Sequence, residues 1–175
     1  MRLSGSSVDP GSVAWLNGLE AERAAAELRP CCAAGAWLTH VVGARPYESR
    51  GDLLATSDTV VAGFDDAALA EALAAHPRIG ERRAGSSREA AWSRTEQAAA
   101  LAAGDDLQAL LEQGNREYEQ RFGHVFLIRA AGRGPEEMYA ALRSRLGNDP
   151  GTERTVVLHE LAEIVRHRLE RLVSA

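Results

Sequence analysis

Apolar residues recur at helical spacing along almost the whole chain. Between the glycines, prolines and aspartates they return every three or four positions, which is the period of an amphipathic α-helix. This pattern predicts an all-α fold, a single-domain bundle of about eight helices over residues 1–175, with residues 1–9 loosely ordered. The expected helices cover residues 10–28, 34–44, 51–61, 66–75, 86–104, 105–122, 135–146 and 150–173.

Local signals mark where some of these helices begin and end. Pro77 ends a helix at His76, because proline disfavours the helical conformation of the residue before it. Ser86 and Glu89 have the spacing of a capping box, which predicts that the next helix begins there. Residues 124–132, HVFLIRAAG, are apolar and rich in β-formers, but no neighbouring segment offers a partner strand. We therefore expect a buried extended segment or an irregular turn at that place.

Composition and charge narrow the class of protein. Apolar residues make up 45% of the chain and charged residues 26%, as in soluble globular proteins. The net charge is −5, and the basic residues, all arginines, are interspersed with acids, so we expect no nucleic-acid partner. No apolar run approaches the roughly 20 residues that cross a bilayer, so we expect no membrane span. The amino terminus lacks a secretory pattern, which makes the cytoplasm the expected location.

Two ionisable side chains fall on apolar helix faces. Glu96 shares its face with Trp92 and Ala100, and Arg168 shares its face with Leu161 and other apolar residues. Burying an ion without a partner costs several kcal/mol, so both charges need one. They form either a structural ion pair with each other or part of a polar pocket, in which the two-pronged guanidinium holds a ligand carboxylate.

A histidine supports the polar-pocket alternative. His76 lies at a helix end before a proline, where a side chain is able to project into a cleft. Its unperturbed pKa also suits proton transfer near neutrality. A histidine, a misplaced acid and a misplaced arginine together favour a small-molecule site over a purely structural role.

Two alternatives of other classes stay open at this point. His159, Glu163 and His167 follow one another at offsets of four, so one face of the last helix presents three metal-capable groups, as a metal-dependent hydrolase requires. A solvated charged surface explains the same spacing, and we expect no metal. A non-enzymatic helical interaction module is the second alternative. The adjacent Cys31 and Cys32 match no metal motif and are expected to be reduced packing residues.

Beyond this chemistry, the motifs resemble the OHCU decarboxylase family, whose substrate is 2-oxo-4-hydroxy-4-carboxy-5-ureidoimidazoline. The His-Pro and Glu-Gln motifs, in this order and at this separation, carry the resemblance most specifically. It extends over nearly the whole chain, through the segments 15–49, 74–81 (AAHPRIGE), 93–97 (SRTEQ), 115–133 (NREYEQRFGHVFLIRAAGR) and 160–172 (ELAEIVRHRLERL).

The resemblance implies an all-α homodimer that decarboxylates this intermediate of urate degradation to S-allantoin without a cofactor. It makes His76 the catalytic histidine, and it makes residues 93–97 a substrate-binding helix turn with Glu96 and Gln97 as its polar groups. We take Glu96 as the second catalytic residue. It assigns a backbone wall of amide and carbonyl groups to residues 126–130. The substrate-binding residues that it implies are Pro77, Ser93, Gln97, Phe126, Leu127, Ile128, Arg129, Ala130 and Arg168.

The sequence departs from the commoner family pattern just before this wall. His124-Val125 stands where many members have Phe-Pro. In the mechanism that we expect, His76 and Glu96 form a hydrogen-bonded pair at the hydroxyl and carboxylate of the substrate. Arg168, Gln97 and the wall then hold the rest of it.

Overall fold

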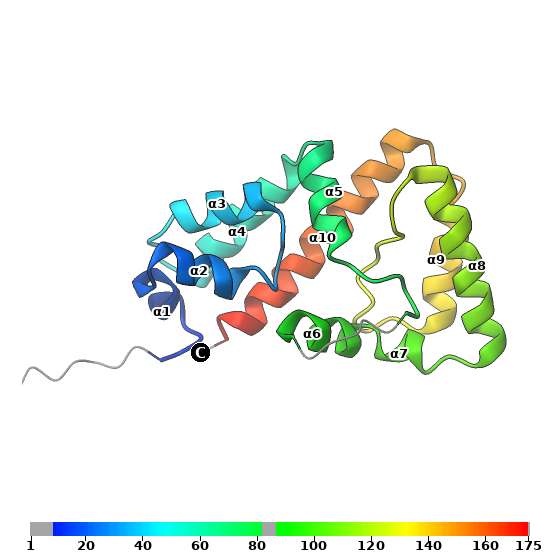
Figure 1. The fold of residues 1–175 in the computed structure, drawn as a ribbon, viewed down its shortest axis with the longest axis horizontal. Coiled ribbons are helices and arrows are strands. Elements are labelled where there is room, and N and C mark those ends of the chain that lie inside the picture. Colours follow the sequence, from blue (N-terminus) through cyan, green and yellow to red (C-terminus); the bar gives the residue numbers. More distant parts are fainter. Residues whose placement is uncertain (1–8, 82–86, 175) are drawn as a thin grey trace, which may run out of the picture.

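The protein is described by a computed structural model that covers residues 9–81 and 87–174, and this part of the chain contains helices and no strand (Figure 1). The all-α prediction is therefore confirmed. The expected loose order of residues 1–8 and the expected cap at Ser86 lie outside the described residues. The helices are α1 Val13–Gly18, α2 Ala21–Leu28, α3 Gly35–Gly43, α4 Arg50–Ala62, α5 Asp66–Ala74, α6 Arg88–Glu96, α7 Ala98–Leu101, α8 Asp105–Phe122, α9 Pro135–Arg145 and α10 Pro150–Leu172.

Two of the expected helices are each divided in two, which is why ten helices are described where about eight were expected. The helix expected over 10–28 breaks at Leu19, whose backbone is extended. Arg45 Nη1 donates to the carbonyls of Leu16 and Leu19, at 2.7 Å each, and so satisfies the end of α1 from a distant part of the chain. No local pattern announces that contact.

The second division lies at the site region. The helix expected over 86–104 breaks at Gln97, whose buried side chain accepts a hydrogen bond from the backbone of Gly80. Ser87 caps the start of α6 through its hydroxyl, which accepts from the Ala90 N–H. The break turns Gln97 inward, and α7 then continues as a single short turn.

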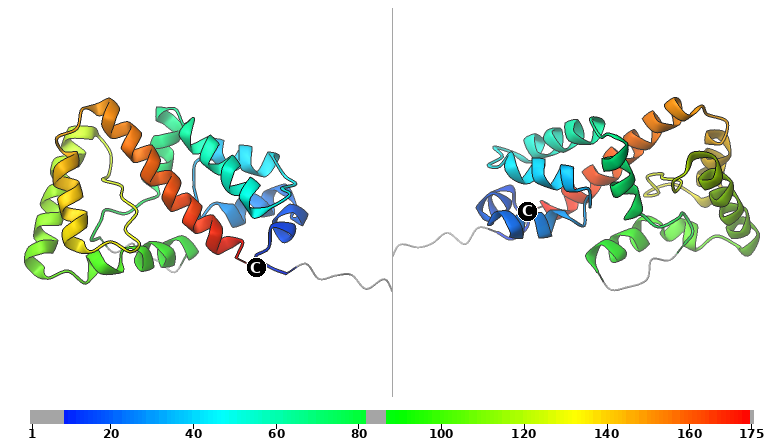
Figure 2. Two further views of the ribbon diagram at one scale, coloured as in Figure 1. Left: turned by 180° about the vertical axis from the view of Figure 1, so that it is seen from behind. Right: turned by 45° about the horizontal axis from the view of Figure 1, so that its top comes forward.

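Helix α10 connects two groups of helices. It runs diagonally between α1–α5 on one side and the paired α8 and α9 on the other, with α6 and α7 along one edge (Figure 1). Seen from behind, α10 crosses most of the molecule (Figure 2). One apolar cluster joins α1–α5 to α10, and a second lies between α8, α9 and the segment before α9. Among the described helices none is long and apolar enough to cross a bilayer.

Cys31 and Cys32 are buried free thiols in the turn between α2 and α3, and both belong to the first apolar cluster. Desolvation raises the pKa of Cys32 to about 11 and also raises the pKa of Cys31. Both groups are therefore held as neutral thiols, and they pack as small apolar residues, outside the helices rather than on them.

Helices α8 and α9 approach closely at Gly114. A Cβ at this position would lie 2.5 Å from Cδ2 and 3.2 Å from Cγ of Leu142, which is fully buried. Because both atoms lie in a filled core, Leu142 has little room to yield.

We expect Gly114→Ala to lower the free energy of unfolding by about 1 kcal/mol, since overpacking outweighs the gain in helix propensity. Urea denaturation followed by circular dichroism measures this change. Gly43→Ala is the matched control, because a Cβ on Gly43 of α3 meets nothing within 4 Å. That variant is expected to be neutral or stabilising. Equal behaviour of the two variants would contradict the packing argument.

Candidate active site

A single pocket brings together the site residues that the sequence suggested. It is a concave space that opens to solvent. Its lining includes all eleven predicted residues, His76, Pro77, Ser93, Glu96, Gln97, Phe126, Leu127, Ile128, Arg129, Ala130 and Arg168. It also includes four that sequence reasoning missed, Ile79, Ala131, Ile164 and His167. Placement in one pocket is a structural result, and the roles of these residues stay predictions.

The turn after α5 that carries His76 is fixed by contacts from two helices. Gln97 Oε1 accepts from the Gly80 N–H at 3.2 Å, and Asn115 Nδ2 of α8 donates to the Ile79 carbonyl at 2.9 Å. Gly80 has φ +85°, a left-handed conformation that residues with a Cβ rarely adopt. Held in this way, the turn keeps the half-buried His76 at the pocket.

Glu96 and Arg168 form a two-pronged ion pair inside the pocket lining. Arg168 Nε donates to Glu96 Oε1 at 2.9 Å, and Nη2 donates to Oε2 at 2.7 Å. The side chains are only 11% and 3% exposed, respectively. Arg168 also donates to Ser93 Oγ and to the Pro30 carbonyl, at 3.2 Å each. The pair therefore joins α6 and α10 to the turn between α2 and α3.

Both alternatives that the sequence left open, an ion pair and a polar pocket, apply to Glu96 and Arg168. The charges pair with each other, and the pair itself lines the pocket. The guanidinium edge that we expected to hold a ligand carboxylate instead faces Glu96, because a carboxylate from the same core matches that fork best. Arg168 is thus placed to orient Glu96 rather than to grip a ligand with both prongs.

The wall of the pocket is irregular backbone with an alternating arrangement of side chains. Leu127 packs in the first apolar cluster, whereas Phe126, Ile128 and Ala130 pack in the second. An alternation of this kind is typical of an extended chain, as one of the two sequence alternatives proposed. The described residues provide no partner strand for it.

Side chains take over the hydrogen bonds that a neighbouring strand would have made. Arg145 Nη1 of α9 donates to the Leu127 carbonyl at 2.8 Å. Glu160 of α10 accepts from the Arg129 N–H at 2.7 Å. The Ile128 N–H and carbonyl, by contrast, form no hydrogen bond with any described residue. Since buried backbone groups need partners, the free edge at Ile128 is available to a ligand.

Behind the wall lies a buried ionic network that the sequence analysis did not identify. Glu153 of α10 accepts from Arg145 Nε at 2.8 Å, from Asn148 Nδ2 at 2.7 Å and from the hydroxyl of Tyr118. Burial and the hydrogen bond to Glu153 raise the pKa of Tyr118, so its hydroxyl stays a donor. The helical offset of Glu153 from Val157 and Leu161 was the available signal, because it places this acid on the apolar face.

The departure at His124-Val125 lies outside the pocket lining. The His124 ring contacts Tyr118 edge-on, with 5.5 Å between ring centroids, and stacks on Phe122 at 6.3 Å. His124 therefore makes aromatic contacts beside the second apolar cluster, and the wall begins only after it.

The described residues give the metal-site alternative no support. His159 and Glu163 line a separate hollow on α10, whereas His167 faces the pocket. Side chains eight residues apart on an α-helix point in clearly different directions, because eight residues are not a whole number of turns. His159 and His167 are therefore separated. No group of three His, Cys, Asp or Glu residues arranged to hold a metal ion is found in the part of the chain that the structure describes.

The fold and the site together define a helical protein with a partly enclosed pocket for a small molecule, lined by a histidine and a buried carboxylate–arginine pair. A sequence model of the OHCU decarboxylase family matches residues 17–170. The chain therefore belongs to the OHCU decarboxylase family.

Individual relatives agree with this assignment. The chain is 31% identical over 149 residues to the 2-oxo-4-hydroxy-4-carboxy-5-ureidoimidazoline decarboxylase of Amia calva, covering 83% of this chain and 81% of that protein. It is 31% identical over 152 residues to the uric acid degradation bifunctional protein TTL of Arabidopsis thaliana, covering 85% of this chain and 47% of TTL. The fold matches a crystal structure of OHCU decarboxylase in the presence of (S)-allantoin, with a TM-score of 0.74, 24% identity, and coverage of 90% of this chain and 100% of that one.

We expect the free energies of unfolding of Glu96→Gln, Arg168→Gln and the double variant to show a coupling of about 2 kcal/mol, because each single variant leaves a buried partner unpaired. Urea denaturation measures the cycle. The exposed pair Glu112 and Arg116, at 3.9 Å on α8, is the control and is expected to show almost no coupling. Equal coupling in both cycles would contradict the assigned burial effect.

Arg145→Met is expected to destabilise the protein by about 3–5 kcal/mol, since it leaves the Glu153 carboxylate buried with its main partner removed. Thermal and urea unfolding measure this loss. Arg143→Met, two residues away on α9, removes the same charge from an exposed pair with Glu117 and is expected to change stability very little. A small effect of Arg145→Met would show that the network does not hold the wall.

Proposed function

We propose that this protein is a cofactor-independent decarboxylase that converts 2-oxo-4-hydroxy-4-carboxy-5-ureidoimidazoline to S-allantoin in the degradation of urate. Membership of the OHCU decarboxylase family supports the reaction class. The Amia calva decarboxylase and the Arabidopsis thaliana uric acid degradation protein, to which the chain is similar, support the substrate and the pathway. The observation that carries the proposal is the convergence of His76, the Glu96–Arg168 pair and the wall on one pocket.

The proposed reaction requires the protein to orient the substrate and to control the delivery of a proton. The bond from the ring carbon to the carboxylate breaks and carbon dioxide leaves, while the electron pair passes into the adjacent carbon–nitrogen double bond of the substrate. A proton then has to reach one face of the ring for a single stereoisomer to form. The protein must therefore align the breaking bond with that π system and restrict proton delivery to one side.

His76 is the proposed proton-handling group. It lies at the pocket on a turn that Gln97 and Asn115 hold in place. Glu96 is its proposed partner for the hydroxyl and carboxylate region of the substrate. Each Glu96 oxygen accepts one hydrogen bond from Arg168, which leaves one further lone pair on each oxygen for a substrate donor or for His76.

The wall is proposed to recognise the ureido group and the ring edge through its backbone. The Leu127 carbonyl and the Arg129 N–H are occupied by Arg145 and Glu160, so these two groups are withdrawn from the expected set. Of the wall groups without a partner among the described residues, the Ile128 N–H and carbonyl lie between these two supports, as one donor and one acceptor on a single residue. A ureido group presents the complementary acceptor and donor, so this edge fits it.

The family resemblance also leads us to propose that the chain acts as one catalytic domain in a homodimer in the cytoplasm. Sedimentation velocity of the purified protein tests the assembly. A monomer at assay concentrations would overturn the homodimer and leave the decarboxylase proposal standing.

The functional prediction is tested with freshly oxidised urate that has passed through the preceding hydrolase step. The wild-type protein is expected to accelerate the appearance of S-allantoin, followed by circular dichroism, above the slow racemic background. His76→Ala is expected to lose this activity, since the variant lacks the proposed proton-handling imidazole, while its helical spectrum stays unchanged. His159→Ala, on the exposed face of α10, is the control and is expected to keep full turnover. Full turnover of His76→Ala would overturn the role of His76, and an inactive wild-type protein would overturn the function itself.

A further inference from the structure

One glutamate and two arginines line the pocket, and among the described residues only one of these three has no ion-pair partner. Glu96 and Arg168 neutralise each other. Arg129 is half-buried, and its guanidinium forms no ion pair or hydrogen bond with any residue that the structure describes. Glu160 accepts a hydrogen bond from the backbone N–H of Arg129, and its carboxylate is also paired with Arg133. The pocket therefore carries one unbalanced positive charge.

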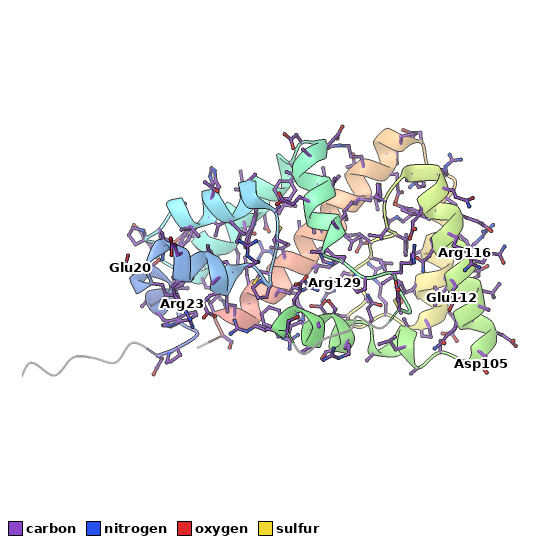
Figure 3. All side chains as sticks on the ribbon, viewed as in Figure 1. Glu20, Arg23, Asp105, Glu112, Arg116 and Arg129 are labelled. Carbon is purple, nitrogen blue, oxygen red and sulfur yellow. The ribbon has the colours of Figure 1, made fainter. Side chains whose placement is uncertain are left out.

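The alternation of the wall indicates where this charge lies. Arg129 is two residues beyond Leu127, so its side chain leaves the backbone on the same side as Leu127, the side of the cluster that contains α10. Helix α10 supplies Ile164, His167 and Arg168 to the same pocket. In the view of Figure 3 the labelled Arg129 falls within the outline of the molecule, near α6 and α10, whereas Arg116 lies at its outer edge on α8.

We propose that the guanidinium of Arg129 binds the carboxylate of the substrate and makes the pocket selective for the anionic substrate over the neutral product. This inference rests on the function proposed above. The substrate enters with one carboxylate, and the neutral Glu96–Arg168 pair offers that charge no net attraction, so Arg129 is the cation that remains for it. A planar guanidinium matches a carboxylate with two parallel hydrogen bonds. Once carbon dioxide leaves, the ring product is neutral and loses this attraction, which favours its release.

The position of Arg129 in the reaction predicts which kinetic constant it controls. Its contact is made to the carboxylate oxygens, which stay in place until the carbon–carbon bond has broken, so it stabilises the bound substrate and the transition state to a similar extent. Arg129 is therefore a binding residue rather than a catalytic one, and its loss raises KM without lowering kcat. The affinity for neutral S-allantoin does not involve this contact.

The experiment compares Arg129→Gln with the wild-type protein and with Arg116→Gln, which removes the same charge from an exposed position on α8. For Arg129→Gln we expect KM to rise about tenfold or more, the effect of losing a charge-assisted contact, with kcat within about twofold of wild type. The inhibition constant of S-allantoin is expected to stay unchanged, as is the melting temperature. Arg116→Gln is expected to leave all four quantities at their wild-type values. An unchanged KM in Arg129→Gln, or an equal rise in KM and in the inhibition constant, would overturn the proposal.

A binding measurement separates this inference from the proposed function. Calorimetric titration with hydantoin-5-acetate, an anionic ring, and with neutral S-allantoin needs no turnover. Arg129→Gln is expected to bind the anion about tenfold more weakly than the wild-type protein and to bind the neutral ligand with unchanged affinity. If the wild-type protein has no decarboxylase activity but Arg129→Gln still shows this selective loss of affinity, the anion site is supported. Only the proposed reaction is then overturned. Equal affinity of both proteins for the anion would overturn the anion site, whatever the turnover.

Discussion

The Glu96–Arg168 pair is the interaction on which the rest of the site depends. It joins α6 to α10 and, through the Pro30 carbonyl, to the turn between α2 and α3. Because both charges are largely withdrawn from water, each is costly without the other. The pocket therefore exists only when three distant parts of the chain have come together, and the orientation of Glu96 is set by the fold rather than by a ligand.

A second constraint comes from the wall, which is a lone extended segment in an all-helical protein. Its backbone groups have no strand beside them, so Arg145 and Glu160 supply hydrogen bonds from α9 and α10. Arg145 is itself held by the buried Glu153, and its guanidinium lies over the Phe126 ring, 4.6 Å from the centroid. The pocket face at Ile128 stays open because these supports act at the neighbouring residues.

Much of the fold and of the candidate site could be predicted from the sequence, because helix period and capping are local. Glu96 and Arg168 stood out as charges on apolar faces, and the resemblance added the backbone wall. The breaks at Leu19 and Gln97 could not be predicted, since each depends on a contact with a distant residue, Arg45 or Gly80. The Glu96–Arg168 pair was one of the two alternatives that the sequence offered. The contacts of Arg168 with Pro30 and Ser93 could not be predicted, because spacing shows that a charge needs partners but does not identify all of them.

The open edge at Ile128 has a consequence for how this pocket tolerates change. In the proposed function, recognition by an N–H and a carbonyl survives any substitution other than proline that preserves the path of the chain, because these groups belong to the backbone. Charge, in contrast, is proposed to be carried by the neighbouring side chain at position 129. The proposal thus places two kinds of discrimination on adjacent residues, so that one substitution at position 129 changes the second and keeps the first.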